Sequence, residues 1–236
     1  MRNLLLLSNS TNHGQGYLDH AMHELRVLLG AARRLVFVPF ALHDRAAYVA
    51  KARARFATEG IEVDELTANA VGRRLLGSAE AVFVGGGNTF RLLKTLQESE
   101  LLEPLRRRVR DGVPYLGASA GINVVCPTIK TTNDMPIVQP PRFEALGIVP
   151  FQINPHYLDP DPGSRHMGET REDRIREFHE ENDVPVVGLR EGAWLRIEGA
   201  GGQVGGAASA RVFRRGRAPE ELAVGASLEV LLAIAG

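Results

Sequence analysis

The sequence predicts an α/β fold: one three-layer domain in which helices cover both faces of a mostly parallel sheet. Short apolar runs alternate with longer segments of helical spacing through the first half of the chain, as in successive strand–helix–strand units. The apolar runs are continuous, which is typical of strands buried on both faces. The length of 236 residues suits a single α/β domain.

Five apolar runs are predicted as the strands of this sheet: 4–8, 35–40, 61–66, 81–86 and 113–118. The segments between them are predicted as helices: 17–30, 44–59, 70–77 and 88–111. The last segment is long enough for two helices, with Pro104 in the first turn of the second, where proline is tolerated.

The second half of the chain has a different character. Residues 133–143 contain three prolines and predict a loop, 168–181 predict a charged helix, and 184–189 a further buried strand. Two late segments, "AWLRIEG" and "RVFRRG", predict a small β-ribbon around the glycine-rich stretch 199–206. We interpret that stretch as a turn rather than a phosphate-binding loop, because no helix follows it.

The apolar end of the chain leaves two interpretations open. We assign residues 1–236 to one domain, with 216–236 as a C-terminal tail. The tail is either a last core element or a segment used in subunit contacts, because an exposed apolar stripe would be costly. If the tail is used in subunit contacts, the assembly that we expect is a homodimer.

Composition excludes several classes of protein. The 28 Lys and Arg balance the 28 Asp and Glu, so charge gives no reason to expect binding to nucleic acid or to an anionic membrane. The single cysteine, Cys126, excludes an intrachain disulfide and suits a reducing compartment. The first apolar run is too short for a signal peptide, and no run approaches the ~20 residues of a membrane span. We expect a cytoplasmic protein.

Ser119 lies in the pentapeptide "GASAG", directly after the predicted strand 113–118. This pattern matches the G-x-S-x-G nucleophile elbow, in which small neighbours let a strained strand-to-helix turn close and a substrate approach. The amide of Ala120 would then point to the place where negative charge develops. A glycine-rich turn with a capping serine is the alternative.

A second glycine-rich loop follows the predicted strand 81–86, in "VFVGGGNTF". In a parallel sheet this loop and the Ser119 loop both lie at the carboxyl edge, where active sites form. The amide of Gly87 is therefore a candidate second oxyanion donor. A nucleotide site is disfavoured because neither GxGxxG nor GxxxxGK[ST] occurs.

A serine nucleophile needs a base and a group that orients the base. His156 follows a short apolar run in "FQINPHY", as a base at a strand end would, although a buried structural histidine is the alternative. Asp134 and Glu191 are both plausible orienting carboxylates, and the pattern does not choose between them. His20 and His23 share a helix face but lack a third ligand at a useful spacing, so we predict no metal site.

Several blocks of the sequence resemble a known family. The motifs "SNST", "VGGGNTF", "GASAG", "TTNDMPIV", "INPH" and "GETRE" occur in the order found in the S51 serine peptidases of the peptidase E type, which are α-aspartyl dipeptidases. The resemblance spans about residues 1–215. It implies a flavodoxin-like or class I glutamine-amidotransferase-like fold, and a cytoplasmic enzyme that cleaves Asp-X dipeptides through an aspartyl-enzyme without metal or organic cofactor.

The resemblance also implies a role for each matching residue. Ser119 is the nucleophile and His156 the base, while Asp134 and Glu191 both match positions proposed for the third member. The oxyanion hole is implied at Gly86, Gly87 and Ala120, and recognition of the substrate's β-carboxylate at Arg171.

Two substrate contacts have alternatives in the residues themselves. Without the resemblance, Arg171 would be interpreted as a surface residue paired with Glu169 or Glu172. The substrate's α-amine needs acceptors, for which Asp134 or the amide oxygen of Asn88 are candidates.

Two rival functions stay open. A related S51 peptidase acting on β-aspartyl or cyanophycin-like substrates would share the nucleophile and differ in the pocket. A non-catalytic amino-acid-binding protein on the same scaffold would need Arg171 but not Ser119 and His156 together.

Overall fold

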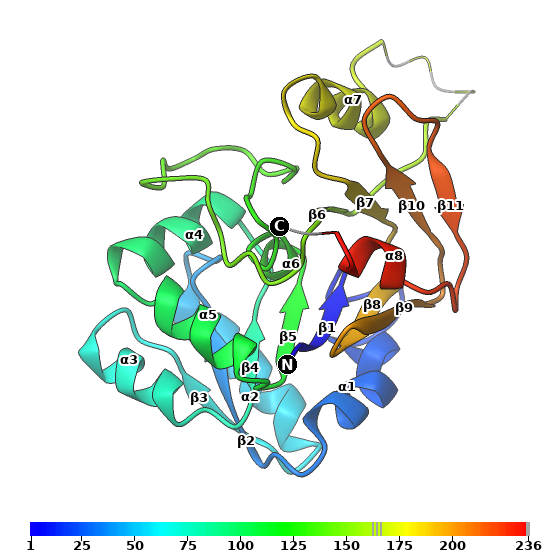
Figure 1. The fold of residues 1–236 in the computed structure, drawn as a ribbon. Helices are drawn as coiled ribbons and strands as arrows, with labels where there is room; N and C mark the ends of the chain where they lie inside the picture. Colours follow the sequence, from blue (N-terminus) through cyan, green and yellow to red (C-terminus); the bar gives the residue numbers. More distant parts are fainter. Residues whose placement is uncertain (162, 164, 166, 235–236) are drawn as a thin grey trace.

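The computed structural model describes residues 1–236 except 162, 164, 166 and 235–236. Its larger sheet has seven strands in the order β3-β2-β4-β5-β1-β8-β9 (Figure 1). The strands from β3 to β1 are parallel, and β8 and β9 continue the sheet antiparallel. Their bounds are β1 Asn3–Leu7, β2 Arg34–Val38, β3 Glu62–Glu65, β4 Val82–Val84, β5 Tyr115–Ala118, β8 Ala193–Glu198 and β9 Gly201–Gly206.

Helices lie on both faces of this sheet, which confirms the predicted three-layer class. One face packs against α1 (Met22–Leu29) and α2 (Arg45–Ala57), with a 3-10 helix at Asp19–Ala21 before α1. The other face packs against α3 (Ala70–Gly77), α4 (Thr89–Glu98), α5 (Leu102–Arg110) and α6 (Ala120–Asn123). The predicted helical segment 88–111 is indeed two helices, and Pro104 lies in the first turn of α5.

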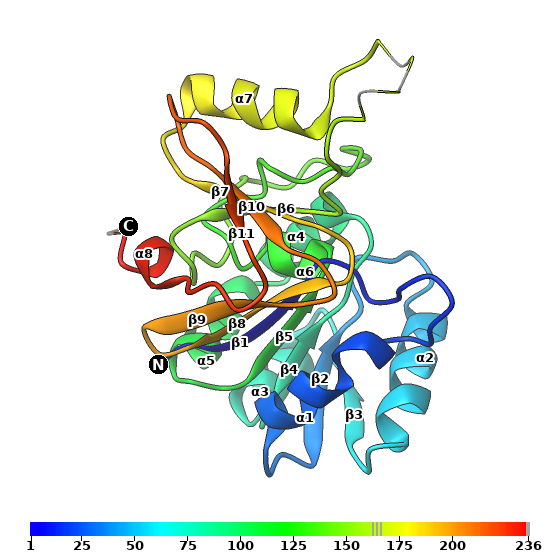
Figure 2. The ribbon, with the colours of Figure 1, turned by 90° about the vertical axis from the view of Figure 1, so that its right-hand side faces the viewer.

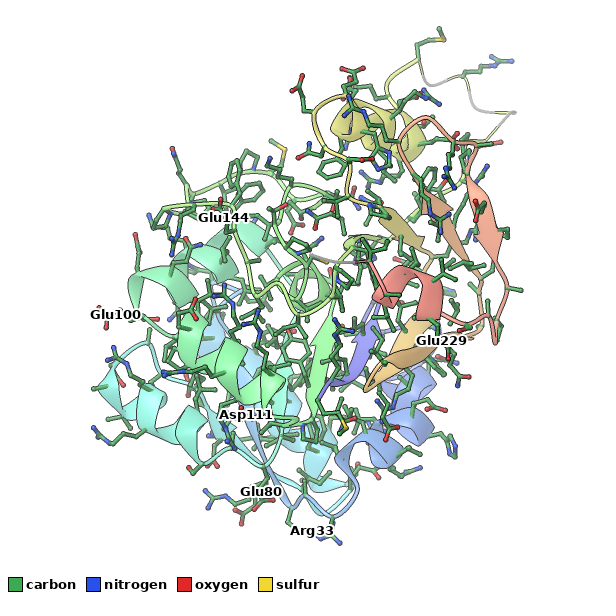
Figure 3. All side chains as sticks on the ribbon, in the orientation of Figure 1. Arg33, Glu80, Glu100, Asp111, Glu144 and Glu229 are labelled. Atoms are coloured by element: carbon green, nitrogen blue, oxygen red, sulfur yellow. The ribbon has the colours of Figure 1, made fainter. Side chains whose placement is uncertain are left out.

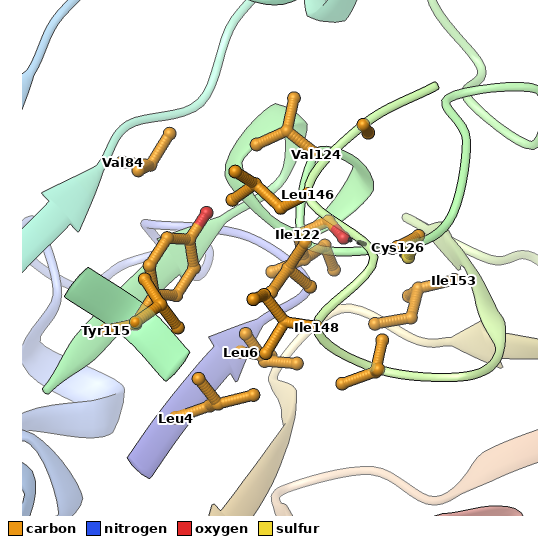
Figure 4. Close-up of a cluster of buried hydrophobic side chains, with 14 of the residues drawn as sticks. Leu4, Leu6, Val84, Tyr115, Ile122, Val124, Cys126, Leu146, Ile148 and Ile153 are labelled. Carbon is orange, nitrogen blue, oxygen red and sulfur yellow. Dashed lines mark hydrogen bonds between the residues drawn. The ribbon is translucent and has the colours of Figure 1, made fainter. Parts of the chain in front are cut away.

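The continuous apolar character of β1 follows from its position between the two layers. Side chains alternate across a strand, so Leu4 and Leu6 join the core of one face while Leu5 and Leu7 join the other. Figure 4 shows Leu4 and Leu6 packed beside Tyr115 and Ile122 in the first of these cores. All four leucines are fully buried.

A second sheet has four strands in the order β11-β10-β7-β6. It lies beside the carboxyl ends of the larger sheet's parallel strands, and α7 (Arg171–Glu181) covers its outer end (Figure 2). Strands β6 and β7 are parallel, and β10 and β11 are antiparallel to them. The bounds are β6 Gln152–Pro155, β7 Val186–Leu189, β10 Ala210–Phe213 and β11 Glu220–Leu222.

The predicted late β-ribbon is wrong in its arrangement. The stretch 199–206 is mostly strand β9, paired with β8, and not a turn between ribbon strands. The other predicted ribbon segment, 211–216, contributes only 211–213 to a strand, and that strand is β10 of the second sheet. Glycine is required in β9 because the Trp194 indole lies across it: a Cβ at Gly205 would be 2.1 Å from the ring.

The C-terminal segment packs partly on the core that contains Leu4 and Leu6. Helix α8 (Glu229–Leu232) follows a loop, and Leu228, Leu231 and Leu232 are buried in the same core as Leu4, while Val230 is exposed. The last two residues of the predicted tail, 235–236, lie outside the described residues.

Charged side chains lie at the periphery of the molecule. Figure 3 labels Arg33 and Glu80 at the end of the molecule opposite the second sheet. The Glu80 carboxylate accepts hydrogen bonds from the amides of Arg33 and Arg34, which lowers its pKa.

None of the helices in the described part of the chain combines the length and the apolar character that a membrane span requires.

Candidate active site

Ser119 lies between strand β5 and helix α6 in a conformation rare for a residue with a side chain. Its φ is 50° and its ψ is −111°. The amide of Ser119 donates to the carbonyl of Leu7 at 3.0 Å, which ties the turn to the end of the neighbouring strand β1. A strained serine between a strand and a helix is the geometry of a nucleophile elbow.

The glycines beside Ser119 are required by close backbone packing. A Cβ at Gly121 would lie 2.2 Å from the carbonyl oxygen of Val84, in strand β4. A Cβ at Gly117 would lie 3.0 Å from the carbonyl oxygen of Gly121, and one at Gly86 would lie 3.1 Å from the Cβ of Ser119. Larger residues would therefore push the turn away from β4.

A continuous chain of polar contacts joins Ser119, His156 and Glu191. The Ser119 Oγ lies 2.9 Å from His156 Nε2, and His156 Nδ1 lies 2.9 Å from Glu191 Oε1. The three residues follow β5, β6 and β7, so parallel pairing in two sheets brings them to one place. The arrangement is that of a hydroxyl nucleophile, a base and a carboxylate that orients the base.

His156 is held in an unusual backbone conformation by Ser8. The φ of His156 is 51°. The buried Ser8 hydroxyl accepts a hydrogen bond from the His156 amide at 2.9 Å and donates one to the Leu189 carbonyl at 2.7 Å. Ser8 thereby fixes the backbone from which the imidazole projects.

Glu191 lies in a turn that is supported from two sides. The Asn9 side-chain oxygen accepts from the amide of Gly192 at 2.8 Å. On the other side of Glu191, the Arg190 guanidinium pairs with Asp159 at 2.7 Å and with Glu221 at 2.5 Å, and it lowers the pKa of both carboxyls.

The end of β1 therefore supports all three residues of the polar contact chain, Ser119, His156 and Glu191. It does so through Leu7, Ser8 and Asn9. Sequence reasoning did not find the roles of Ser8 and Asn9. Their only signal was two polar residues directly after a buried strand, inside the quoted block "SNST".

Asp134 does not lie on the imidazole. Its Oδ2 accepts from the amide of Thr89 at 2.8 Å, from the Thr89 hydroxyl at 2.6 Å and from the Thr132 hydroxyl at 3.1 Å. It therefore satisfies donors at the start of α4, as a capping carboxylate does.

Asn88 is engaged at the same helix end. Its side-chain oxygen accepts from the amide of Arg91 at 3.0 Å, and its side-chain nitrogen donates to the carbonyl of Met135 at 2.8 Å. Asn88 and Asp134 together bind the loop around Met135 to the first turn of α4.

Two of the predicted oxyanion donors have backbone amides that make no hydrogen bond in the described part of the chain. Among the described residues, the amides of Gly87 and Ala120 donate to no backbone or side-chain acceptor, whereas the flanking amides of Gly85 and Asn88 donate to Val38 and Ala41. Burial raises the pKa of Tyr48, and the amide of Gly86, which faces the Tyr48 hydroxyl, offsets part of that rise.

A pocket of about 310 Å³ opens beside Ser119, His156 and Glu191. Its lining comes from the loops after β1, β2, β4, β5, β6 and β7 and from α2: Asn9, Ser10, Thr11, Tyr17, Leu42, Tyr48, Lys51, Gly86, Gly87, Ser119, His156 and Glu191. Sequence reasoning did not single out Lys51, whose surroundings in the sequence are those of an ordinary helix surface.

Arg171 lines a different pocket, of about 410 Å³, together with Leu158, Asp159 and Thr170. It is the first residue of α7, whose start is fixed by a capping box between Thr170 and Asp173. Burial and the nearby Arg174 lower the pKa of Arg171.

The surface pairing considered for Arg171 does not occur. Glu169 pairs with Arg174, and Glu172 with Arg176 and Arg211.

Across the residues that the structure describes, no group of three or more His, Cys, Asp or Glu side chains could hold a metal ion.

Comparison with known proteins identifies relatives along nearly the whole chain. The model of peptidase family S51 matches residues 4–205. A peptidase E from Streptomyces coelicolor is 59% identical over 234 residues, which cover 99% of this chain and 96% of that protein. A probable alpha-aspartyl dipeptidase from Drosophila melanogaster is 49% identical over 234 residues, 98% of both chains.

Two solved structures share the fold at low sequence identity. A peptidase from an acI-B1 Actinobacterium superposes with a TM-score of 0.70 at 18% identity, over 96% of each chain. A putative peptidase E protein from Listeria monocytogenes EGD-e superposes with a TM-score of 0.66 at 21% identity, over 88% of this chain and all of that one.

Proposed function

The chain belongs to peptidase family S51, and from this premise we propose that it is a serine-dependent dipeptidase that hydrolyses Asp-X dipeptides. The observation that carries the proposal is the polar chain from Ser119 through His156 to Glu191, with 2.9 Å at each step. The names of its relatives, peptidase E and alpha-aspartyl dipeptidase, support the substrate class.

In the proposed mechanism the Ser119 hydroxyl attacks the carbonyl carbon of the peptide bond. His156 Nε2 accepts the hydroxyl proton, and Glu191 stabilises the imidazolium from the Nδ1 side. The amides of Gly87 and Ala120, with that of Gly86 beside them, stabilise the oxyanion. His156 then gives its proton to the leaving amine, which leaves an aspartyl-enzyme, and a water molecule activated by His156 releases aspartate.

Selection of an N-terminal aspartate requires a cation for its side chain. We assign this role to Arg171, because a guanidinium binds a carboxylate in a bidentate manner and keeps its charge. Its lack of a carboxylate partner among the described residues supports the assignment. Asn88 and Asp134 enter the proposal as residues that hold the loop beside the site, because their acceptor atoms already bind the first turn of α4.

Assembly and location complete the proposal. We propose a homodimer in the cytoplasm that acts on small dipeptides and uses no metal or organic cofactor. Equilibrium sedimentation of the full chain measures the oligomeric state, and a monomer at micromolar concentration would contradict the dimer.

The experiment that tests the function measures hydrolysis of Asp-Leu, isoaspartyl-Leu, Glu-Leu and N-acetyl-Asp-Leu, with a metal chelator present. We expect cleavage of Asp-Leu alone, and its loss in the Ser119→Ala variant. Cleavage of isoaspartyl-Leu would indicate the cyanophycin-like alternative instead. Binding of Asp-Leu without cleavage would indicate an amino-acid-binding protein on this scaffold.

Arg171→Ala tests the aspartate assignment separately. We expect kcat/KM for Asp-Leu to fall by about 10- to 1,000-fold, because the substrate carboxylate then enters the site unpaired. An unchanged kcat/KM would reject the role of Arg171.

A further inference from the structure

Lys51 is the one lysine or arginine among the described residues that line the Ser119 pocket. The other titratable groups of that lining include the hydroxyls of Tyr17 and Tyr48, whose pKa is raised by burial. The remaining two are Glu191 and His156, which contact each other. Arg171, the cation assigned to the aspartate side chain, lines the separate pocket beside Asp159.

Helix α2 presents Lys51 to the pocket from a fixed position. The helix begins after Asp44, whose side chain accepts from the amide of Ala47 at 2.9 Å. Tyr48 lies three residues before Lys51, so the two side chains share one face of the helix, and both line the pocket. Tyr48 is buried and packs edge-on against Phe37 with ring centroids 4.9 Å apart, which anchors that face to the sheet.

The Lys51 ammonium is held over an aromatic ring of the same pocket. Its Nζ lies 4.4 Å from the centroid of the Tyr17 ring, within the range of a cation–π contact. Across the described residues no carboxylate lies within 4.0 Å of it, whereas Arg55, one turn further along α2, pairs with both Asp19 and Glu59. The helix therefore presents to the pocket a positive charge that no carboxylate neutralises.

An Asp-X dipeptide carries two carboxylates, one on its side chain and one at its C-terminus. Each loses water when it enters the site, so each needs a partner of opposite charge. Arg171 can serve only one of them. We propose that Lys51 binds a carboxylate of the substrate in the Ser119 pocket, and this inference rests on the proposed function. With Arg171 on the side chain, the carboxylate at Lys51 is the C-terminal one.

This pairing gives the pocket a means of selecting peptide length. The C-terminal carboxylate of a dipeptide lies at a fixed distance from the bond that is cut. In a longer peptide an uncharged peptide group occupies that position. Such a peptide therefore leaves Lys51 without its partner.

The test compares wild type, Lys51→Met and Lys51→Arg on Asp-Leu and on Asp-Leu amide, which lacks the C-terminal charge. We expect Lys51→Met to lower kcat/KM for Asp-Leu by about 10-fold or more, chiefly through KM, because the charge pair binds substrate and transition state alike. Lys51→Arg retains most of the activity. The preference of wild type for the acid over the amide disappears in Lys51→Met.

Lys94→Met is the matched control. It removes a lysine of α4 that is paired with Glu98 at 3.7 Å and that does not line the pocket. We expect its kcat/KM for Asp-Leu to match that of wild type. Thermal unfolding of each variant shows whether the fold is retained.

Calorimetric binding separates this inference from the proposed chemistry. Asp-Leu, Asp-Leu amide and Asn-Leu are titrated into Ser119→Ala with and without Lys51→Met, so no turnover is needed. Weaker binding of Asp-Leu without Lys51, in either the acid or the amide form, supports the inference. If Lys51→Met weakens binding of Asp-Leu amide but not of Asn-Leu, the carboxylate at Lys51 is that of the substrate's side chain. Equal affinity with and without Lys51, or no binding of Asp-Leu, overturns the inference.

Discussion

His156 Nδ1 and Glu191 Oε1 lie 2.9 Å apart, and this contact distinguishes two carboxylates that the sequence left as equal candidates. Asp134 contacts Thr89 and Thr132 instead. The pairing is partly open to water, since the side chains of His156 and Glu191 are 38% and 61% exposed. An exposed carboxylate can still orient an imidazole, because the hydrogen bond selects one tautomer and one ring position.

Glu191→Gln is the first prediction. We expect kcat for Asp-Leu to fall by roughly 10²- to 10⁴-fold, because the amide stabilises neither the imidazolium nor the required tautomer. Steady-state kinetics measure the loss, with thermal unfolding as a check on the fold.

Asp134→Asn is the matched control for that variant. It keeps the shape of the side chain but weakens the contacts at the start of α4, so we expect a loss of about 1 kcal/mol in the free energy of unfolding. Its kcat should stay within a few-fold of wild type. A larger loss of kcat in Asp134→Asn than in Glu191→Gln would reverse the assignment.

Ser8→Ala is the second prediction. The change leaves the partly buried amide of His156 without its acceptor, so we expect the free energy of unfolding to fall by about 1–3 kcal/mol. We also expect a lower kcat, because the left-handed backbone of His156 loses the contact that holds it. Urea denaturation and steady-state kinetics measure the two effects.

Ser78→Ala is the control for Ser8. Its hydroxyl donates to the Leu75 carbonyl at 3.2 Å at an exposed site, so its loss should change unfolding free energy by less than about 0.5 kcal/mol. If Ser8→Ala behaves like Ser78→Ala in both measurements, Ser8 does not position His156.

Gly121→Ala is the third prediction. The added methyl would meet the Val84 carbonyl at 2.2 Å, so either β4 or α6 must shift. We expect a loss of about 1–3 kcal/mol in unfolding free energy and a lower kcat, because the shift moves Ser119. Gly77→Ala is the control: no atom lies within 4 Å of its new methyl, and its φ is not positive. It should be neutral or more stable than wild type by up to about 1 kcal/mol.

The larger sheet could be predicted because its signal is local. Strands β1, β2, β4 and β5 send apolar side chains into the cores on both faces, so each appears as a continuous run, and the helices between the strands have their own period. Strand β3, at the edge of the sheet, buries only Val63. Strand β9 could not be predicted in this way, since glycine has no side chain to form a pattern. The second sheet was also missed, because β6 and β7 pair across the whole of α7 and the loop before it.

The candidate active site, too, could be predicted only where its residues have a local sequence pattern. Ser119 and His156 stood out because each follows an apolar run and, for Ser119, because the glycines on both sides form a compact motif. The choice of Glu191 over Asp134 depended on the pairing of β6 with β7, which no local pattern encodes. Lys51 gave no signal because a lysine among the polar residues of an amphipathic helix is ordinary, and only the fold brings this one to the pocket.

Asp173→Asn is the last prediction and concerns pH. Asp173 accepts from the hydroxyl and the amide of Thr170 at the start of α7, and these bonds lower its pKa from 3.8 to about 2. A carboxyl whose pKa is lower in the folded state contributes stability above its unfolded pKa and loses it as pH falls through the folded one. Urea denaturation should therefore show wild type more stable than Asp173→Asn at pH 6, with the difference narrowing below about pH 3.8. Glu177→Gln, which removes an exposed carboxyl of the same helix, should show little difference at any pH. A gap for Asp173→Asn that stays constant from pH 6 to pH 3 would mean that the charge of Asp173 does not hold the first turn of α7, and so does not hold Arg171.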